Sequence, residues 1–189
     1  MVTMQTTTDE QLVKRIKSEG SLAFTPLYHR YKHRVYAYCY RLLKHPQNAE
    51  DAAQETFLKI HRSLQQLDSS ASLQAWIFTI ARNEAYTILR RVRPAEDLDE
   101  IVDDVWDDQT PLDRVVARER SELLQHCLGL LRPVYRDILI LREYEQLSYV
   151  EIARVTGASE SAVKSALFKA RKSMGKKLET ILKGKNDEL

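Results

Sequence analysis

The sequence predicts an all-α fold: two small helical domains joined by an acidic flexible linker, the second domain containing a helix-turn-helix. The chain of 189 residues holds only 5 Gly and 5 Pro, too few for the many tight turns of a β-sandwich or β-barrel. Apolar residues recur in steps of three and four, which is the period of a helix. One acidic segment separates two basic ones, so we place the domains at residues 1–92 and 117–189 and the linker at 93–116.

The formal net charge of +2 is the sum of three unlike segments. Residues 1–92 hold 13 Lys/Arg against 8 Asp/Glu, residues 93–114 hold 2 against 9, and residues 115–189 hold 14 against 10. The middle segment lacks helical periodicity and repels itself, so we expect it to be extended. Two basic modules suggest a polyanionic partner contacted at two places, but charge alone fits a solvated hinge equally well.

The composition excludes several classes of protein. With 43% hydrophobic and 30% charged residues, the chain has the make-up of a globular protein. The two cysteines, Cys39 and Cys127, are too far apart in sequence to indicate a disulfide framework, which fits a reducing cytoplasm. No signal core or run of ~20 apolar residues occurs, so we expect a cytoplasmic protein without membrane insertion.

Motifs for catalysis are missing from the sequence. It has no Gly-rich phosphate loop, nucleophile elbow or recognisable carboxylate pair, so we expect neither enzymatic turnover nor a cofactor. His29 and His33 lie four residues apart on a predicted helix, but no Glu follows His29 and the spacing indicates no third ligand. We therefore expect no metal site.

The first two helices follow from a cap and a long apolar stripe. Thr8 begins a capping-box pattern ahead of the first helix. The second carries its apolar stripe over residues 27–42 and ends before Pro46. Its start is open between Ser21 and Thr25, because proline is favourable only in the first turn of a helix.

The third and fourth helices each carry a distinctive polar strip. Asn48 is the predicted cap of the third helix, on which Asp51 and Glu55 lie four apart on one exposed strip. A polar break at residues 68–72 precedes the fourth helix. The outward face of the fourth helix mixes cations, an amide and an aromatic ring, which suits phosphates and unstacked bases but also an ordinary solvated surface. These residues are Thr79, Arg82, Asn83, Tyr86 and Arg90.

The second domain contains the most specific pattern in the chain. Residues 119–131 and 133–144 are two predicted helices. Ser148 then starts a capping box, Gly157 supplies a left-handed turn and Ser159 caps the next helix. Two short helices joined in this way predict a helix-turn-helix, whose second helix enters a major groove.

The second of these helices has an outward face suited to duplex DNA. Its side chains can meet phosphates, base edges and a thymine methyl group. The alternative is a structural hairpin with a basic exterior. The face comprises Lys164, Ser165, Phe168, Lys169, Arg171 and Lys172.

Together these motifs resemble a bacterial RNA polymerase sigma factor of the extracytoplasmic-function (ECF) group of the sigma-70 family. Residues 48–57 are similar to the family's polymerase-binding helix, and residues 76–83 to the start of its promoter-melting helix. Residues 147–172 resemble its carboxy-terminal reading head, including the Val-Lys-Ser signature at 163–165. The resemblance covers most of the chain and places the motifs in the family's order.

The resemblance implies an alternative transcription initiation factor that binds the RNA polymerase core and directs it to promoters. Asp51, Gln54 and Glu55 would bind the clamp helices of the largest subunit. The polymerase flap, promoter DNA and an anti-sigma factor are the other implied partners, and the acidic linker would follow the RNA exit channel.

The resemblance also assigns residues to the two promoter elements. The outward face of the helix-turn-helix, Lys164 to Lys172, would read the minus-thirty-five element. Other residues would capture a base of the minus-ten element and hold the melted strand. These are Lys59, Leu67, Asp68, Ser69, Ser70, Arg82, Asn83, Tyr86 and Arg90.

Three positions depart from the family pattern. The family commonly has an acid at Thr87, an aromatic residue at Leu67 and an arginine at Ala166. These departures leave base capture and promoter preference open, whereas the fold does not depend on them.

Two other functions fit parts of the sequence. A stand-alone helix-turn-helix regulator would bind duplex DNA without polymerase, usually as a dimer, but the first domain shows no effector pocket. A helical adaptor would bind only proteins, and its basic faces would serve solubility.

Overall fold

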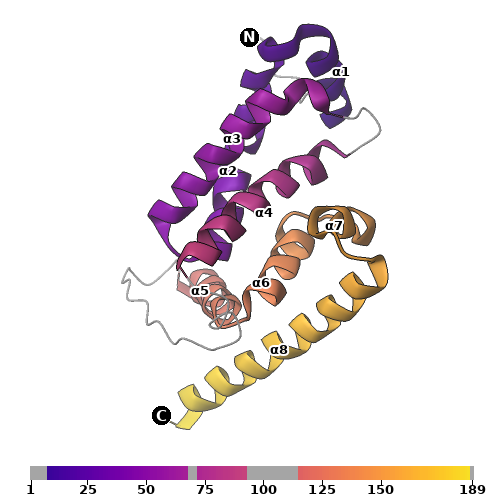
Figure 1. The fold of residues 1–189 in the computed structure, drawn as a ribbon. Coiled ribbons are helices and arrows are strands. Elements are labelled where there is room, and N and C mark those ends of the chain that lie inside the picture. The colour runs from indigo at the N-terminus through magenta and orange to yellow at the C-terminus, as the bar shows by residue number, and fades with distance from the viewer. Residues whose placement is uncertain (1–7, 68–71, 93–114, 188–189) are drawn as a thin grey trace.

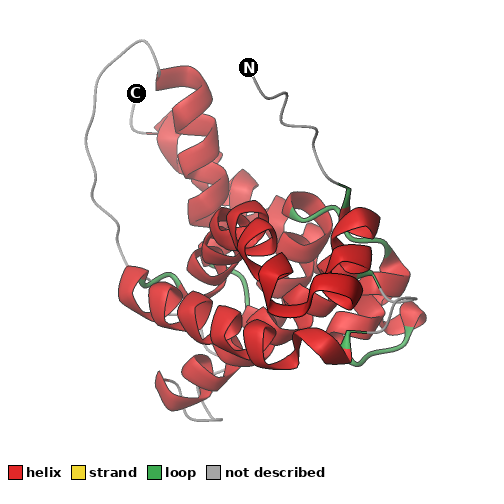
Figure 2. Cartoon of the chain, turned by 90° about the horizontal axis from the view of Figure 1, so that it is seen from above, coloured by secondary structure: helices red, strands yellow, loops and turns green. Residues whose placement is uncertain are grey.

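The computed structural model describes residues 8–67, 72–92 and 115–187, and all of its regular elements are helices (Figures 1 and 2). The all-α prediction is therefore confirmed for the described residues. The predicted linker lies mostly outside them, and the helix after it begins two residues before the expected boundary at 116. In order, the elements are α1 (Asp9–Glu19), the 3-10 turn η1 (Gly20–Ala23), α2 (Phe24–Leu43), α3 (Pro46–Ser63), the 3-10 turn η2 (Leu64–Gln66), α4 (Leu73–Val92), α5 (Val115–Gly129), α6 (Pro133–Leu139), the π-turn η4 (Ile140–Tyr144), α7 (Tyr149–Thr156) and α8 (Glu160–Asp187).

The first module is a bundle in which α3 and α4 pack on α2 (Figure 1). Its core contains the fully buried side chains of Tyr31, Tyr38 and Phe78, and the Tyr38 and Phe78 rings meet edge to face at 5.3 Å. Burying one such aromatic side chain stabilises the fold by roughly 1.5–3 kcal/mol. The apolar stripe predicted for the second helix is thus the side of α2 that faces the core.

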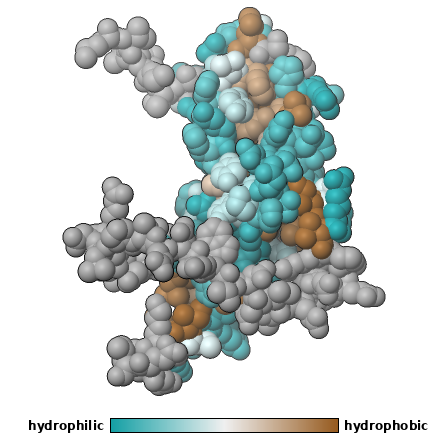
Figure 3. Space-filling model, turned by 90° about the vertical axis from the view of Figure 1, so that its left-hand side faces the viewer, coloured by the Kyte–Doolittle hydropathy of each residue, from teal (hydrophilic) through white to brown (hydrophobic). Residues whose placement is uncertain are grey.

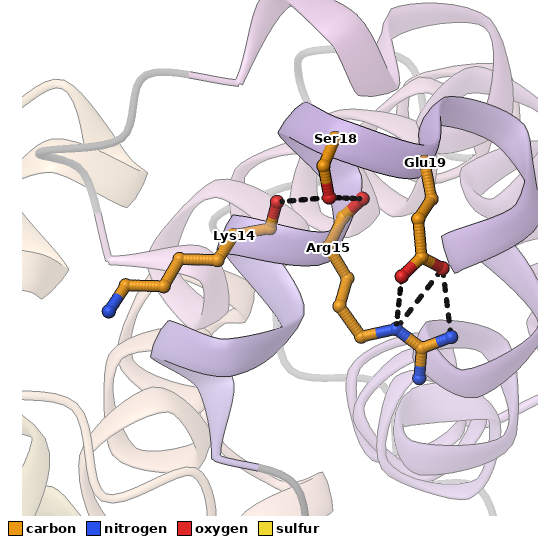
Figure 4. Close-up of polar contacts among 4 residues, drawn as sticks. All are labelled: Lys14, Arg15, Ser18 and Glu19. Atoms are coloured by element: carbon orange, nitrogen blue, oxygen red, sulfur yellow. Dashed lines mark hydrogen bonds and ion pairs between the residues drawn. The ribbon is translucent and has the colours of Figure 1, made fainter.

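The helix α1 starts and is stabilised as its sequence predicts. The Thr8 Oγ1 accepts a hydrogen bond from the Gln11 backbone N–H, and the Thr8 N–H donates to the Gln11 side chain. Further along, Arg15 pairs with Glu19 at 2.9 Å on the exposed side, and the Ser18 hydroxyl donates to the Lys14 carbonyl at 3.1 Å (Figure 4). Both contacts join residues one turn apart.

The junction of α2 and α3 differs from the prediction. Lys44 adopts a left-handed conformation, φ 58°, and ends α2, while the ring of His45 accepts a hydrogen bond from the Asn48 N–H at 3.4 Å. His45 therefore caps α3, and Asn48 lies inside its first turn. The physical reason is Pro46, which forces the preceding residue into the extended conformation of a cap and is itself suited to the first helical position.

The helix-turn-helix has the predicted caps. The Ser148 side chain accepts from the Glu151 N–H and the Glu151 carboxylate accepts from the Ser148 N–H, while Gly157 has φ 70°. Ser159 Oγ accepts from the Ala162 N–H at 3.2 Å and starts α8. The helix α8 then continues to Asp187, beyond the predicted reading segment.

The two modules pack against each other, with α4 on α7 and α2 on α5 and α6 (Figure 1). Buried residues of both modules form one continuous apolar cluster. Two charged side chains of the second module, Asp137 and Glu145, are buried at this junction, with 1% and 3% exposure. The arrangement brings α6 and η4 onto the same faces of α2 and α4 that carry cationic side chains.

Candidate nucleic-acid interface

The outward face of α8 is fully available. Val163, Leu167 and Ala170 point into the core, so the residues between them are turned to solvent. All six predicted duplex-reading residues are exposed. Phe168 is the unusual one, because an aromatic side chain that is 69% exposed contributes little to folding and is free to contact a ligand.

Around this face the remaining surface is mixed. Arg171 pairs with Glu143 at 2.7 Å, and both side chains are about half exposed, so the pair leaves the guanidinium within reach of solvent. Ala166 packs against the core cluster at the edge of the face. Figure 3 shows another side of the molecule, on which hydrophilic surface separates several apolar patches.

The face of α4 predicted to hold melted DNA is divided by the second module. Asn83 and Arg90 are exposed. Arg82, in contrast, lies with its Nε 2.7 Å from Asp137 Oδ2 and its guanidinium 4.3 Å from the centre of the Tyr86 ring. The Tyr86 hydroxyl is buried and has no hydrogen-bond partner among the described residues. Two of the five side chains on this face therefore contact the second module.

Asp137 is the centre of a buried polar network. It accepts hydrogen bonds from the Tyr38 hydroxyl and from Arg82, each at 2.7 Å. Burial raises the pKa of the Asp137 carboxyl, while the charge of Arg82 and the Tyr38 hydrogen bond oppose that rise. Burial, followed by the nearby carboxylate, also raises the pKa of the Tyr38 and Tyr86 hydroxyls, which keeps both protonated.

Glu145 forms a second contact between the modules. Arg34 donates to Glu145 Oε2 at 3.0 Å, and the Gln74 side-chain amide donates to the Glu145 backbone carbonyl. Burial raises the pKa of this carboxyl, and the Arg34 charge opposes the rise. The Arg41 guanidinium lies 4.1 Å from the centre of the neighbouring Tyr144 ring. Cations of the first module thus face carboxylates and a ring of the second.

The other residues assigned to the minus-ten element have different positions. Lys59 Nζ pairs with Glu84 at 2.6 Å across α3 and α4. Leu67 is fully buried, which corrects its assignment as a DNA contact: an apolar side chain at the end of η2 gains more by joining the core than by facing solvent. Asp68, Ser69 and Ser70 lie outside the described residues. Thr87 donates to the Asn83 carbonyl at 2.8 Å, which is a contact within its own helix.

A separate strip lies on the outer side of α3. Asp51, Gln54 and Glu55 are all exposed, and Gln47 donates to Asp51 at 3.4 Å. Leu58, one turn after Gln54, is 41% exposed and extends the strip with an apolar side chain. Sequence reasoning missed Leu58, although its spacing from Asp51 and Glu55 would have placed it on the same strip.

Sequence reasoning also missed Arg34, Asp137 and Glu145. Helical periodicity shows which side of a helix is buried but does not identify the element that covers it, so a polar residue at such a position carries no local signal. Among the described residues no three potential metal-ligating side chains gather, and no helix is both long and apolar enough to span a membrane.

An all-helical chain with a capped helix-turn-helix and a basic, exposed second helix has the architecture of a sequence-specific DNA-binding protein. Comparison with known families narrows this class. Residues 27–106 match the family described as Sigma-70 region 2, and residues 121–174 match Sigma-70, region 4. The chain belongs to the ECF group of the sigma-70 family.

Individual relatives are similar over nearly their whole length. The RNA polymerase sigma-H factor of Pseudomonas aeruginosa is 32% identical over 93% of this chain and 96% of its own. The ECF RNA polymerase sigma factor SigW of Bacillus subtilis is 28% identical over 89% and 96%. The sigma factor RpoE of Bartonella quintana, solved with the anti-sigma factor NepR, has a TM-score of 0.67 at 25% identity and covers 82% of this chain and 96% of its own.

Proposed function

We propose that the chain gives promoter specificity to RNA polymerase core, with its second module anchored on duplex DNA and its first module holding separated strands. The observation that carries this is the exposed basic face of α8, centred on Phe168, behind a capped helix-turn-helix in a chain of the sigma-70 family. Catalysis belongs to the polymerase, and this chain has no turnover of its own. Its place of action is the cytoplasm, where the polymerase lies.

The minus-thirty-five element is read by α8. Lys164 and Lys169 can donate to guanine or to phosphates, and Ser165 can donate or accept at base edges. The Phe168 ring can contact a thymine methyl group. Arg171 and Lys172 lie toward the next turn and suit phosphate contacts, which fix register rather than sequence.

The minus-ten element is held by α4 and by the chain before it. Taking a base out of the stack costs a few kcal/mol, which hydrogen bonds and stacking must offset. Asn83 supplies the amide and Arg90 the charge, and both are exposed. Lys59, Arg82 and Tyr86 join them after release from their present partners, and residues 68–70 complete the pocket.

The strip on α3 binds the polymerase core. Three acidic or amide side chains, with Leu58 beside them, form a small polar surface with an apolar centre, as protein interfaces commonly have. We assign Asp51, Gln54, Glu55 and Leu58 to the clamp helices of the largest subunit. The second module reaches the flap, the linker follows the RNA exit channel, and an anti-sigma factor holds the chain inactive.

A gel-shift experiment separates this function from its alternatives. Promoter fragments are expected to shift only when the chain and the polymerase core are both present. Strong sequence-specific binding by the chain alone would instead support a stand-alone regulator, and no DNA dependence would support an adaptor.

Charge reversal tests the assignment of the α3 strip. We expect Asp51→Lys with Glu55→Lys to abolish association with core in a pull-down assay, because four units of charge change on one exposed strip. The control, Glu10→Lys with Glu50→Lys, makes the same change at other exposed positions and should bind core normally. Equal loss in both variants would show that net charge, not the strip, decides binding.

A further inference from the structure

A row of cationic side chains in the first module lies under buried carboxylates of the second. Arg34, Tyr38 and Arg41 are four and three residues apart on α2, so they share one side of that helix. Arg82 faces them from α4. Opposite this row are Asp137 and Glu145, which are almost completely buried.

These contacts are of a kind that separates readily. The attraction between buried charges is largely cancelled by the loss of their hydration, so such pairs specify an arrangement more than they stabilise it. The exchange is also incomplete, because the buried Nε of Arg41 has no hydrogen-bond acceptor within the described parts of the chain. An unsatisfied cationic donor is costly, and an anion reaching it would remove that cost.

We propose that Arg34, Arg41 and Arg82 form a binding surface for the phosphodiester backbone of promoter DNA, and that Asp137 and Glu145 cover this surface until the modules separate. The guanidinium group binds carboxylate and phosphate oxygens with the same forked geometry, so the two carboxylates occupy positions that phosphates can take. The inference rests on the proposed function and adds Arg34 and Arg41 to the DNA-binding residues.

The covered surface makes the two DNA contacts unequal in this conformation. The outward face of α8 is exposed, so binding of duplex DNA needs no rearrangement. Arg82 has only 20% of its side chain exposed, and the Tyr86 hydroxyl is buried. Holding single-stranded DNA therefore requires the modules to separate.

The test uses the full chain with Asp137→Asn and Glu145→Gln, which keep side-chain size and remove both charges. Small-angle scattering is expected to show a larger radius of gyration. Affinity for a short labelled single-stranded oligonucleotide, measured by fluorescence anisotropy, should rise about tenfold if the closed state holds about nine tenths of the wild-type population. The salt dependence should steepen by about 0.7 for each phosphate newly contacted.

Two controls separate this effect from general charge. Glu10→Gln with Glu179→Gln removes two exposed carboxylates and should change neither the radius nor the affinity. In the opened variant, adding Arg34→Gln and Arg41→Gln should abolish the gain in affinity. Adding Lys14→Gln and Arg62→Gln, at exposed positions, should keep it.

The outcomes are distinct. Opening without a gain in single-strand affinity overturns the binding surface, and a gain without opening overturns the cover. If circular dichroism shows that the double variant is unfolded, Glu145→Gln alone is used, because its partner Arg34 is already 37% exposed at the edge; it should give a smaller gain with the same salt effect, and no gain overturns the proposal. Wild-type transcription with core is measured in parallel, since its failure would reject the proposed function rather than the covered surface.

Discussion

Arg136 joins the ends of two helices through one side chain. It donates to the carbonyl oxygens of Leu128, Gly129 and Leu131 at 2.6–3.2 Å, at and just beyond the end of α5, and to the carbonyl oxygen of Leu42 at 2.7 Å, near the end of α2. Helix carboxyl ends carry free carbonyls and partial negative charge, so a guanidinium between two of them satisfies both. The sequence shows only an arginine near an apolar run, because the convergence of these helices arises in the tertiary structure.

Replacing Arg136 should strongly destabilise the fold. We expect Arg136→Leu to lower the free energy of unfolding by about 3 kcal/mol, because it leaves buried carbonyls without donors. Urea denaturation measures the change. Arg154→Leu, at an exposed position on α7, should change it by less than about 0.5 kcal/mol, and similar losses in both would contradict the role given to Arg136.

Phe168 should matter for binding but not for folding. We expect Phe168→Ala to weaken binding to duplex carrying the minus-thirty-five element by about tenfold or more, since a good base contact discriminates by about 1–3 kcal/mol. The melting temperature should hardly change, because the ring is 69% exposed. A variant with a clearly lower melting temperature would show instead that the ring packs.

At the scale of the element, two glycines in the second module should respond to alanine with opposite signs. Gly157 has φ 70°, which strains any side chain although no atom lies within 4 Å of an added Cβ. Gly175 lies within α8, again with open space around the added Cβ. We expect Gly157→Ala to destabilise by about 1 kcal/mol and Gly175→Ala to stabilise by about 0.5–1 kcal/mol. Thermal unfolding of both variants measures this, and equal signs would contradict the geometry of the turn.

Individual elements were largely predictable because their signals are local. The capping boxes at Thr8 and Ser148, the turn at Gly157 and the buried stripes all act between residues within one or two turns of each other. The error at Asn48 arose where two local rules competed and the proline rule decided the cap. The π-turn η4 replaces the end of a predicted continuous helix and leads to the buried Glu145, a position set by the first module.

At the scale of the whole molecule, the predicted division into two modules leaves out their packing. The residues that join them, Tyr38 to Asp137 and Arg34 to Glu145, are separated by about a hundred positions in sequence, so no local pattern reports them. The same distance explains the incomplete prediction of the minus-ten face. Its residues were found on α4 by their spacing, while the covering of Arg82 by Asp137 depends on the arrangement of both modules.

Transcription in vitro from a library of randomised promoters, with sequencing of the transcript ends, tests the central claim most directly. With both the core polymerase and this chain present, we predict transcripts from templates that share two short elements at a constant spacing, and a Lys164→Ala variant should alter selection only at the upstream element. Transcripts without a shared pair of elements, or the same selection by core without this chain, would contradict the account.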